Sequence, residues 1–271
     1  MSADPVATGE VPAAGSTGGS ATGSTAGSTA GSTAGSTAEA PLASLVWDAQ
    51  PAGATVVALV MHGGAVDGHE PNRPWSHNVA RLVPFARSLK KVPGPMAVAR
   101  LRFRVRGWNG DAMPVQDARW ALAQVEAAYP GVPIALVGHS MGGRVAMFVG
   151  DDPAVRLVVG LAPWVEPGDP RPGNGTRTVL IHGDRDVICS LGRTRRAVEQ
   201  MQADGLDASL VRVARADHAM LVRARLWTAL VTEVVGATFA RELGGTAEPR
   251  SGPVGAVVAQ VVHSGGVTVD I

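Results

Sequence analysis

The chain has 271 residues, which is enough for one domain with a sizeable hydrophobic core. Its 24 basic and 23 acidic residues leave a formal net charge of +1, so the composition gives no sign of a nucleic-acid surface or of an acidic partner. The single cysteine excludes an internal disulfide and fits a reducing compartment.

The first residues show no basic stretch followed by an apolar one, so no signal peptide is evident. No run of about 18 apolar residues occurs, and the apolar stretch 254–262 is too short to cross a membrane. We therefore expect a cytoplasmic protein with no membrane partner.

Residues 1–40 have low sequence complexity. The tetrad Gly-Ser-Thr-Ala repeats from Gly23 to Ala38 and offers no large apolar side chain and no charge. Such a repeat cannot offset the entropy lost on ordering it, so we expect 1–40 to be a disordered tail or linker. The composition then divides the rest into a folded domain over 41–243 and a C-terminal tail over 244–271.

Strand and helix patterns alternate along the folded domain. Apolar runs predict strands at 54–61, 96–105, 133–137, 155–161, 177–182 and 208–214. Helical patterns occur at 78–90 (bent near Pro84), 115–129, 141–150, 191–204 and 220–241. This alternation predicts an α/β fold with a mainly parallel sheet and helices on both faces. The Val-rich tail after Gly244 either adds an edge strand or stays loose.

The sequence Gly138-His139-Ser140-Met141-Gly142 follows one of the predicted strands and precedes a predicted helix. Gly-x-Ser-x-Gly between a strand and a helix is the nucleophile-elbow pattern. The turn is so tight that larger side chains two positions before and after the serine would clash. In return, the serine hydroxyl is exposed at the tip of the turn.

Three further segments accompany this pattern in a consistent order: His62-Gly63-Gly64 before it, then His182-Gly183-Asp184-Arg185-Asp186 and Ala216-Asp217-His218 after it. With these motifs, residues of about 42–241 resemble the α/β-hydrolase superfamily in its uncapped, bacterial serine hydrolase or esterase form. The resemblance implies the α/β-hydrolase fold and the chain order Ser, acid, His.

The resemblance implies that Ser140 is the nucleophile, His218 the base and Asp186 the acid that orients the base. A serine hydroxyl needs such a base within hydrogen-bond reach, and the base needs a partner that fixes its tautomer. All three residues follow predicted strands, where the ligands of open α/β sheets bind.

Other residues compete for two of these roles. Asp184 lies two positions nearer the strand and is expected to brace the loop, and Asp217 is a chain neighbour of His218, whose side chain should diverge from it. His62 and His182 each precede a glycine at a strand end and are expected to orient loops, whereas His139 should point away from the serine.

The oxyanion hole needs two backbone N–H donors. We expect these from Met141, directly after the nucleophile, and from Gly64, with Ala65 as the alternative to Gly64. Arg106-Gly107-Trp108-Asn109-Gly110 resembles a loop that the family places beside its active site. Trp108 either lines the substrate pocket or caps the sheet.

We expect neither a cofactor nor a metal, because the spacing of Asp67, His69, Glu70 and His77 matches no ligand motif. The Pro-rich segment 163–176 is too short for a helical cap domain. An open site for small or extended substrates follows from this.

The sequence therefore predicts a serine hydrolase that cleaves a carboxylic ester or thioester of a small-molecule acyl substrate through an acyl-enzyme on Ser140. Amide hydrolysis, acyl transfer and perhydrolysis use the same residues, so the substrate and its chain length stay open, as does the oligomeric state. The alternative from another class is a non-catalytic binding or scaffold protein that keeps the fold. A surface-tethered protein with residues 1–40 as its stalk is a third, weaker alternative.

Overall fold

The computed structural model describes residues 42–244 and 251–271. The predicted N-terminal tail over 1–40 lies outside these residues, as does the beginning of the predicted C-terminal tail. None of the described helices is long and apolar enough to cross a membrane.

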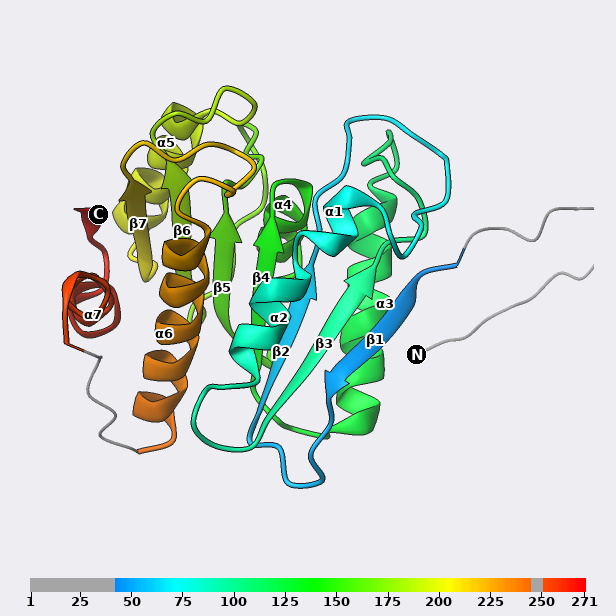
Figure 1. Cartoon of the computed structure of the whole chain (residues 1–271), viewed down its shortest axis with the longest axis horizontal. Coiled ribbons are helices and arrows are strands. Elements are labelled where there is room, and N and C mark those ends of the chain that lie inside the picture. Colours follow the sequence, from blue (N-terminus) through cyan, green and yellow to red (C-terminus); the bar gives the residue numbers. More distant parts are fainter. Residues whose placement is uncertain (1–41, 245–250) are drawn as a thin grey trace, which may run out of the picture. The chain divides into compact units, whose positions relative to one another are not determined.

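Eight strands form one sheet in the order β1-β3-β2-β4-β5-β6-β7-β8 (Figure 1). Only β1 is antiparallel to its neighbour, and every other pair of adjacent strands is parallel. The strands are β1 (Ser44–Ala49), β2 (Val56–Met61), β3 (Met96–Arg102), β4 (Ile134–His139), β5 (Val155–Leu161), β6 (Arg177–Gly183), β7 (Ala208–Val213) and β8 (Thr268–Asp270).

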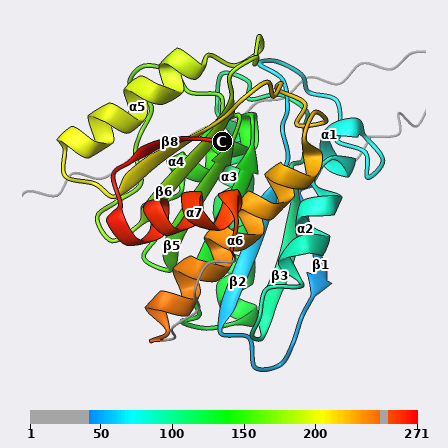
Figure 2. The same cartoon turned by 60° about the vertical axis from the view of Figure 1, so that its left-hand side comes forward.

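Helices cover both faces of the sheet. They are α1 (His77–Ala80), α2 (Val83–Leu89), α3 (Met113–Ala128), α4 (Met141–Phe148), α5 (Leu191–Ala203), α6 (Ala224–Glu242) and α7 (Pro253–Ala259). Figure 2 shows α2, α6 and α7 on one face of the sheet, and α3, α4 and α5 contribute to the core on the other face. The mainly parallel, doubly covered sheet that the sequence predicts is therefore present.

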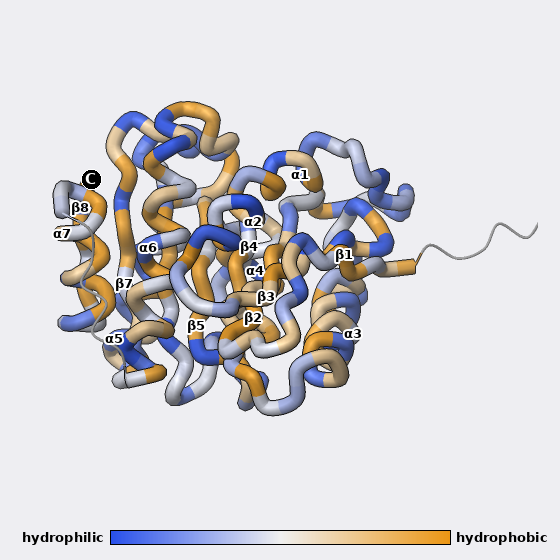
Figure 3. The backbone as a smooth tube through the Cα atoms, turned by 60° about the horizontal axis from the view of Figure 1, so that its bottom comes forward, coloured by the Kyte–Doolittle hydropathy of each residue, from blue (hydrophilic) through white to orange (hydrophobic). Residues whose placement is uncertain are grey.

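Two hydrophobic cores lie on the two faces of the sheet. One packs the strands against α2, α6 and α7, and the other packs them against α3, α4 and α5. All six residues of β2 are buried, as are all six of β4, because both strands lie in the middle of the sheet and are covered on both sides. Figure 3 shows this apolar interior as hydrophobic stretches along the central strands.

Three segments differ from the sequence prediction. The single bent helix expected over 78–90 is two helices, because Pro84 lies in the first turn of α2 and supplies no backbone N–H to the turn before it. The edge strand β1 was not predicted. The Val-rich tail contributes β8 at the other edge of the sheet, and it also forms α7 and the π-helical turn Gln260–Ser264, which were not predicted.

The parallel strands bring distant parts of the sequence to one edge of the sheet. The loops after β2, β4, β6 and β7 all leave from the carboxyl ends of their strands. Ligands of open α/β sheets bind at this edge. Between β5 and β6 the chain forms only the loop 163–176, with no helix in it, so no cap domain is inserted at this point of the described chain.

Candidate active site

Ser140 lies in the tight turn between β4 and α4. Its backbone has φ 54° and ψ −116°, a conformation that side-chain-bearing residues rarely adopt. A Cβ on Gly138 would lie 2.1 Å from the carbonyl oxygen of Gly142, and one on Gly142 would lie 2.4 Å from that of Met61. The two glycines of the motif are thus required by close backbone approach. The turn holds the serine in a strained but fixed position.

Ser140, His218 and Asp186 form a continuous chain of hydrogen bonds. The His218 Nδ1 lies 2.8 Å from Asp186 Oδ2, and its Nε2 lies 3.1 Å from Ser140 Oγ. Because a carboxylate only accepts, Nδ1 carries the hydrogen and donates it. Nε2 is then left with the lone pair, which can accept the serine proton. The three residues come from the loops after β4, β6 and β7.

The Asp186 carboxylate is buried and accepts hydrogen bonds at both oxygens. Its Oδ1 accepts from the N–H groups of Ile188 and Cys189, both at 2.8 Å. Its Oδ2 faces His218 and also His182, whose Nε2 is 3.2 Å away. Burial raises the pKa of this carboxyl, but the hydrogen bonds from His182, His218 and Cys189 outweigh it and hold the pKa well below its usual range.

His182 is a neighbour of the site that the sequence argument assigned only to loop orientation. Its Nε2 faces two acceptors, Asp186 Oδ2 and the carbonyl oxygen of Cys189 at 3.2 Å, so this nitrogen carries the hydrogen. Its Nδ1 lies 2.9 Å from the hydroxyl of Thr194 in α5 and accepts from it. Asp186 is thereby tied to α5 as well as to His218. The turn after β6 brings His182 and Asp186 together, and the sequence spacing alone did not indicate this contact.

His139 and His62 are buried and support the loops around the serine. The Nε2 of His139 donates to the backbone oxygen of His218 at 3.0 Å, so His139 positions the loop that carries His218. The Nε2 of His62 accepts from the N–H of Phe103 at 3.2 Å, and its Nδ1 donates to Gly63 O at 2.6 Å. Burial lowers the pKa of His62 to about 4. Burial, together with the charge of His218, lowers the pKa of His139 to about 3.

Because of these two histidines, we expect the free energy of unfolding to fall in mild acid. Both have folded-state pKa values below the ordinary 6.5, so below that pH the unfolded chain binds the protons first. Each should cost about 1.4 kcal/mol of unfolding free energy per pH unit between pH 6.5 and its folded-state pKa. Urea unfolding at about pH 7 and about pH 5 measures the loss.

His62→Gln and His139→Gln should each give a smaller difference between the two pH values. His263→Gln is the control, because His263 is exposed. Equal unfolding free energies of the wild type at the two pH values would contradict the prediction.

Asp184 and Asp217, the two alternatives to Asp186, make different contacts from Asp186. Asp184 Oδ1 accepts from the backbone N–H of Arg215 at 2.6 Å, so Asp184 ties the loop after β6 to the loop after β7. Asp217 has a buried Oδ1 without a hydrogen-bond partner among the described residues. Of the carboxylates in the described part of the chain, only that of Asp186 contacts the His218 ring.

The backbone segments that carry the two expected oxyanion donors, Met141 and Gly64, are close to each other in the structure. Met141 begins α4, where a helix has backbone N–H groups without intrahelical partners. A Cβ on Gly63 would lie 3.3 Å from Ser140 Cβ, and one on Gly64 would lie 2.4 Å from the Met141 sulfur. The loop after β2 thus runs directly beside the serine. The N–H of Ala65 donates to Arg106 O at 3.0 Å, whereas that of Gly64 has no such bond to a described residue.

Cys189 also borders the serine, and the sequence argument did not place it there. Its Sγ is 3.9 Å from Ser140 Oγ, and the residue is buried. Burial and the nearby Asp186 charge raise the pKa of the thiol to about 12. The sulfur is therefore a neutral wall of the site at physiological pH.

Trp108 packs into a cluster around Arg144 of α4. The guanidinium carbon of Arg144 lies 4.1 Å from the ring centre of Trp108 and 4.3 Å from that of Trp164. Asp169 pairs with the same guanidinium at 2.7 Å. Trp108 therefore connects the loop after β3 with α4 and with the loop 163–176. These contacts fix the position of its ring.

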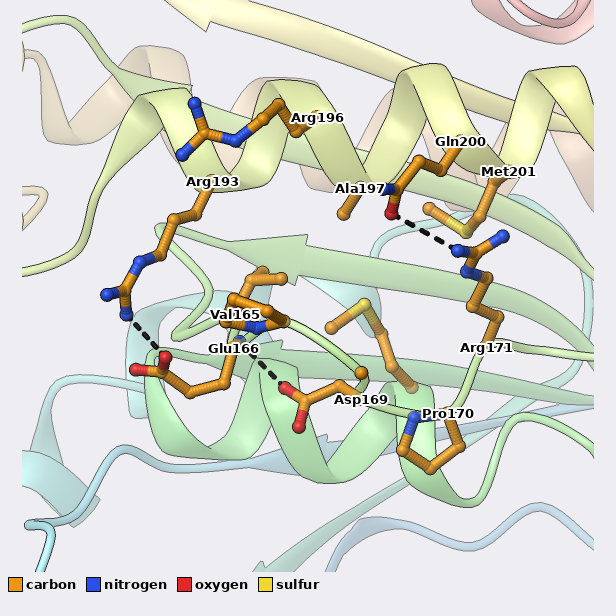
Figure 4. A pocket seen from close by; sticks show the side chains of 13 residues that line it. Val165, Glu166, Asp169, Pro170, Arg171, Arg193, Arg196, Ala197, Gln200 and Met201 are labelled. Carbon is orange, nitrogen blue, oxygen red and sulfur yellow. Dashed lines mark hydrogen bonds and ion pairs between the residues drawn. The ribbon is translucent and has the colours of Figure 1, made fainter.

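Ion pairs hold the loop 163–176 against α5 (Figure 4). Glu166 pairs with Arg193, and Arg171 pairs with Asp204 and donates to Gln200. The hollow between the loop and the helix has a volume of only about 90 Å³. This loop is therefore fastened to the body of the protein at both of its halves. No three metal-binding side chains cluster within the described ranges.

Comparisons with known proteins agree on the fold. A family model described as serine aminopeptidase, S33, matches residues 104–177, which include the elbow. No curated protein sequence matches the chain.

Solved structures match over most of the chain. XC6422 from Xanthomonas campestris, described as an α/β serine hydrolase without lid, has 19% sequence identity and a TM-score of 0.57 over 74% of this chain and 89% of its own. The propionate-bound esterase Est2 from Thermogutta terrifontis has 19% identity and a TM-score of 0.57 over 77% and 92%. A serine hydrolase homologue from Coxiella burnetii has 18% identity and a TM-score of 0.55 over 70% and 89%. The chain has the α/β-hydrolase fold in its lidless form.

Proposed function

We propose that this chain, with its α/β-hydrolase fold, is a serine hydrolase that cleaves a carboxylic ester or thioester through an acyl-enzyme on Ser140. The observation that carries the proposal is the chain of hydrogen bonds from Ser140 through His218 to Asp186. Its direction, with the Nε2 lone pair facing the serine hydroxyl, is the one that proton transfer requires.

In the first half-reaction, Ser140 Oγ bonds to the substrate carbonyl carbon while its proton passes to His218 Nε2. The carbonyl electron pair moves to the oxygen, and the resulting charge accepts hydrogen bonds from the N–H groups of Met141 and Gly64. The bond from carbon to the leaving group then breaks, and the Nε2 proton goes to the departing oxygen or sulfur. Asp186 stabilises the imidazolium and keeps Nδ1 as the donor.

In the second half-reaction, water attacks the acyl carbon and gives its proton to His218 Nε2. The bond to Ser140 Oγ breaks, and the same proton returns to the serine. The product is a free carboxylic acid, and the enzyme is restored. Apart from the substrate and one water molecule, the two half-reactions use the side chains and backbone N–H groups named above.

Three observations support an ester or thioester over a non-catalytic binding role. The Ser140 backbone is strained, and such strain tends to persist where function requires it. Within the described residues no cap domain is inserted between β5 and β6, which leaves room for small or extended acyl compounds. Two of the similar solved structures are described by action on esters: the propionate-bound esterase and an acetyl ester-xyloside bifunctional hydrolase from Caldicellulosiruptor lactoaceticus.

Labelling with a fluorophosphonate tests the proposal directly. The reagent phosphonylates an activated serine, so we expect one added group per chain, located by mass spectrometry on the peptide that contains Ser140. Ser140→Ala should stay unlabelled, and Ser264→Ala should react like the wild type because Ser264 is exposed in the turn before β8. An unlabelled native protein would favour a binding protein instead.

A further inference from the structure

A cavity of about 460 Å³ lies beside the loop that carries His218. One wall is formed by α1 and the first turn of α2, and the other by the residues after His218 and the start of α6. Figure 2 shows α2 alongside α6, and Ser88 and Thr232 join these two helices by a 2.7 Å hydrogen bond. The volume falls within the range of small-molecule sites.

The cavity begins one residue from the base of the proposed reaction. Ala219, Met220 and Leu221 line it and follow His218 directly in the chain. In the proposed mechanism His218 Nε2 must protonate the leaving group, so the leaving group has to lie on the His218 side of the scissile bond. The acyl oxygen is held on the other side, by Met141 and Gly64. The segment that follows His218 thus connects this cavity with the side on which the alcohol or thiol leaves in the proposed reaction, while neither Ser140 nor His218 itself lines the cavity.

The lining of the cavity combines apolar surface with positive charge. Pro84 and Leu221 contribute exposed apolar surface, and Phe85 and Met220 are buried behind it. Among the described residues that line it, Arg81, Arg225 and His77 are the ionisable ones, and none is a carboxylate. Within the described ranges, neither Arg81 nor Arg225 forms an ion pair or a side-chain hydrogen bond. This differs from Arg144, Arg171 and Arg193, which all have acidic partners.

We infer that this cavity binds the leaving group of the substrate, and that this leaving group has an apolar body with an anionic group at its far end. An apolar body replaces water along Pro84 and Leu221. The anion gives Arg81 and Arg225 the acidic partner that the described residues do not supply. The inference rests on the proposed function for the orientation of the substrate.

Two aryl acetates test the charge preference without changing the acyl group. 4-Acetoxybenzoate and 4-acetoxybenzamide both carry the same acetyl group. Their leaving groups, 4-hydroxybenzoate and 4-hydroxybenzamide, differ by one negative charge. The measured quantity is the ratio of their kcat/KM values, divided by the ratio of their rates with hydroxide. This normalisation removes the difference in chemical reactivity.

We expect a normalised ratio above one in the wild type, which falls as salt is added because ions screen the attraction. Arg81→Gln and Arg225→Gln should each lower the ratio about 3- to 10-fold, mainly through KM. Arg225→Lys should keep part of it. Arg87→Gln is the matched control, since Arg87 is an exposed arginine of α2 that does not line the cavity.

Binding to the Ser140→Ala protein separates this inference from the proposed function. Calorimetric titration of this protein with 4-hydroxybenzoate and 4-hydroxybenzamide should show tighter binding of the anion, 4-hydroxybenzoate. Adding both Arg81→Gln and Arg225→Gln to the Ser140→Ala protein should abolish this preference for the anion. Hydrolysis of both esters without a charge preference in either assay would overturn the inference and leave the serine hydrolase intact. An anion preference in binding without any hydrolysis would keep the site and overturn the proposed function.

Discussion

Ser140→Ala and His218→Ala should each lower kcat for a p-nitrophenyl ester by about 10³-fold or more. The alanine at 140 removes the atom that bonds to the acyl carbon. The alanine at 218 leaves the serine hydroxyl with no base within hydrogen-bond distance, since the other close contact of Oγ is the Cys189 thiol. The double variant should be little worse than either single one, because the two residues act as one unit.

Initial rates of the three purified variants on one ester check this expectation, with circular dichroism to verify the fold. Cys189→Ala serves as a neighbouring control that keeps the hydrogen-bond chain. Near-native turnover by either single variant would show that the reaction does not run through Ser140 and His218.

Asp186→Asn should lower kcat at neutral pH on the order of 10⁴-fold. Oδ1 of Asp186 accepts two backbone N–H groups, so the amide oxygen of an asparagine must take that place. Its NH₂ group then faces the His218 ring and can only donate. His218 Nδ1 is forced to accept, its hydrogen moves to Nε2, and the lone pair that should receive the serine proton is lost.

Asp184→Asn and Asp217→Asn are matched comparisons for this variant. Asp184 braces the loop through the Arg215 N–H, a bond that an amide oxygen can also accept, and Asp217 does not contact the His218 ring. Both should lose far less activity than Asp186→Asn. If the folded Asp184 variant were the inactive one, the acid would have to be reassigned to Asp184.

The buried parallel strands were predictable because their apolar runs are continuous. The strand at 155–161 matches its predicted bounds, and those at 177 and 208 differ by one residue at their ends. The edge strand β1 gave no such signal, since its residues are only partly buried and Trp47 packs edge-on against Tyr129 of another element. Val257 and Val258 of α7 have a high intrinsic preference for strands. They nevertheless form a helix here, in which both side chains are buried in the core that includes α6.

The sequence predicted which loops meet at the site, and it did not predict what supports them. The three segments with Ser140, Asp186 and His218 converge because each follows a parallel strand, which the motif order already indicated. The catalytic roles of these residues stay predictions. The second histidine on Asp186 and the arginine between two tryptophans depend on side-chain directions from separate elements, and spacing alone does not fix those directions.

The buried thiol next to the serine has a practical consequence for spectroscopy. The chain has one cysteine, and that cysteine is protonated and shielded at neutral pH. Maleimide dyes and nitroxide spin labels react with exposed thiolates, so they should leave the native protein unmodified. A cysteine introduced on the surface would then carry the only probe on the molecule. Distances and motions of the loops around the site become measurable without first removing a residue that borders the serine.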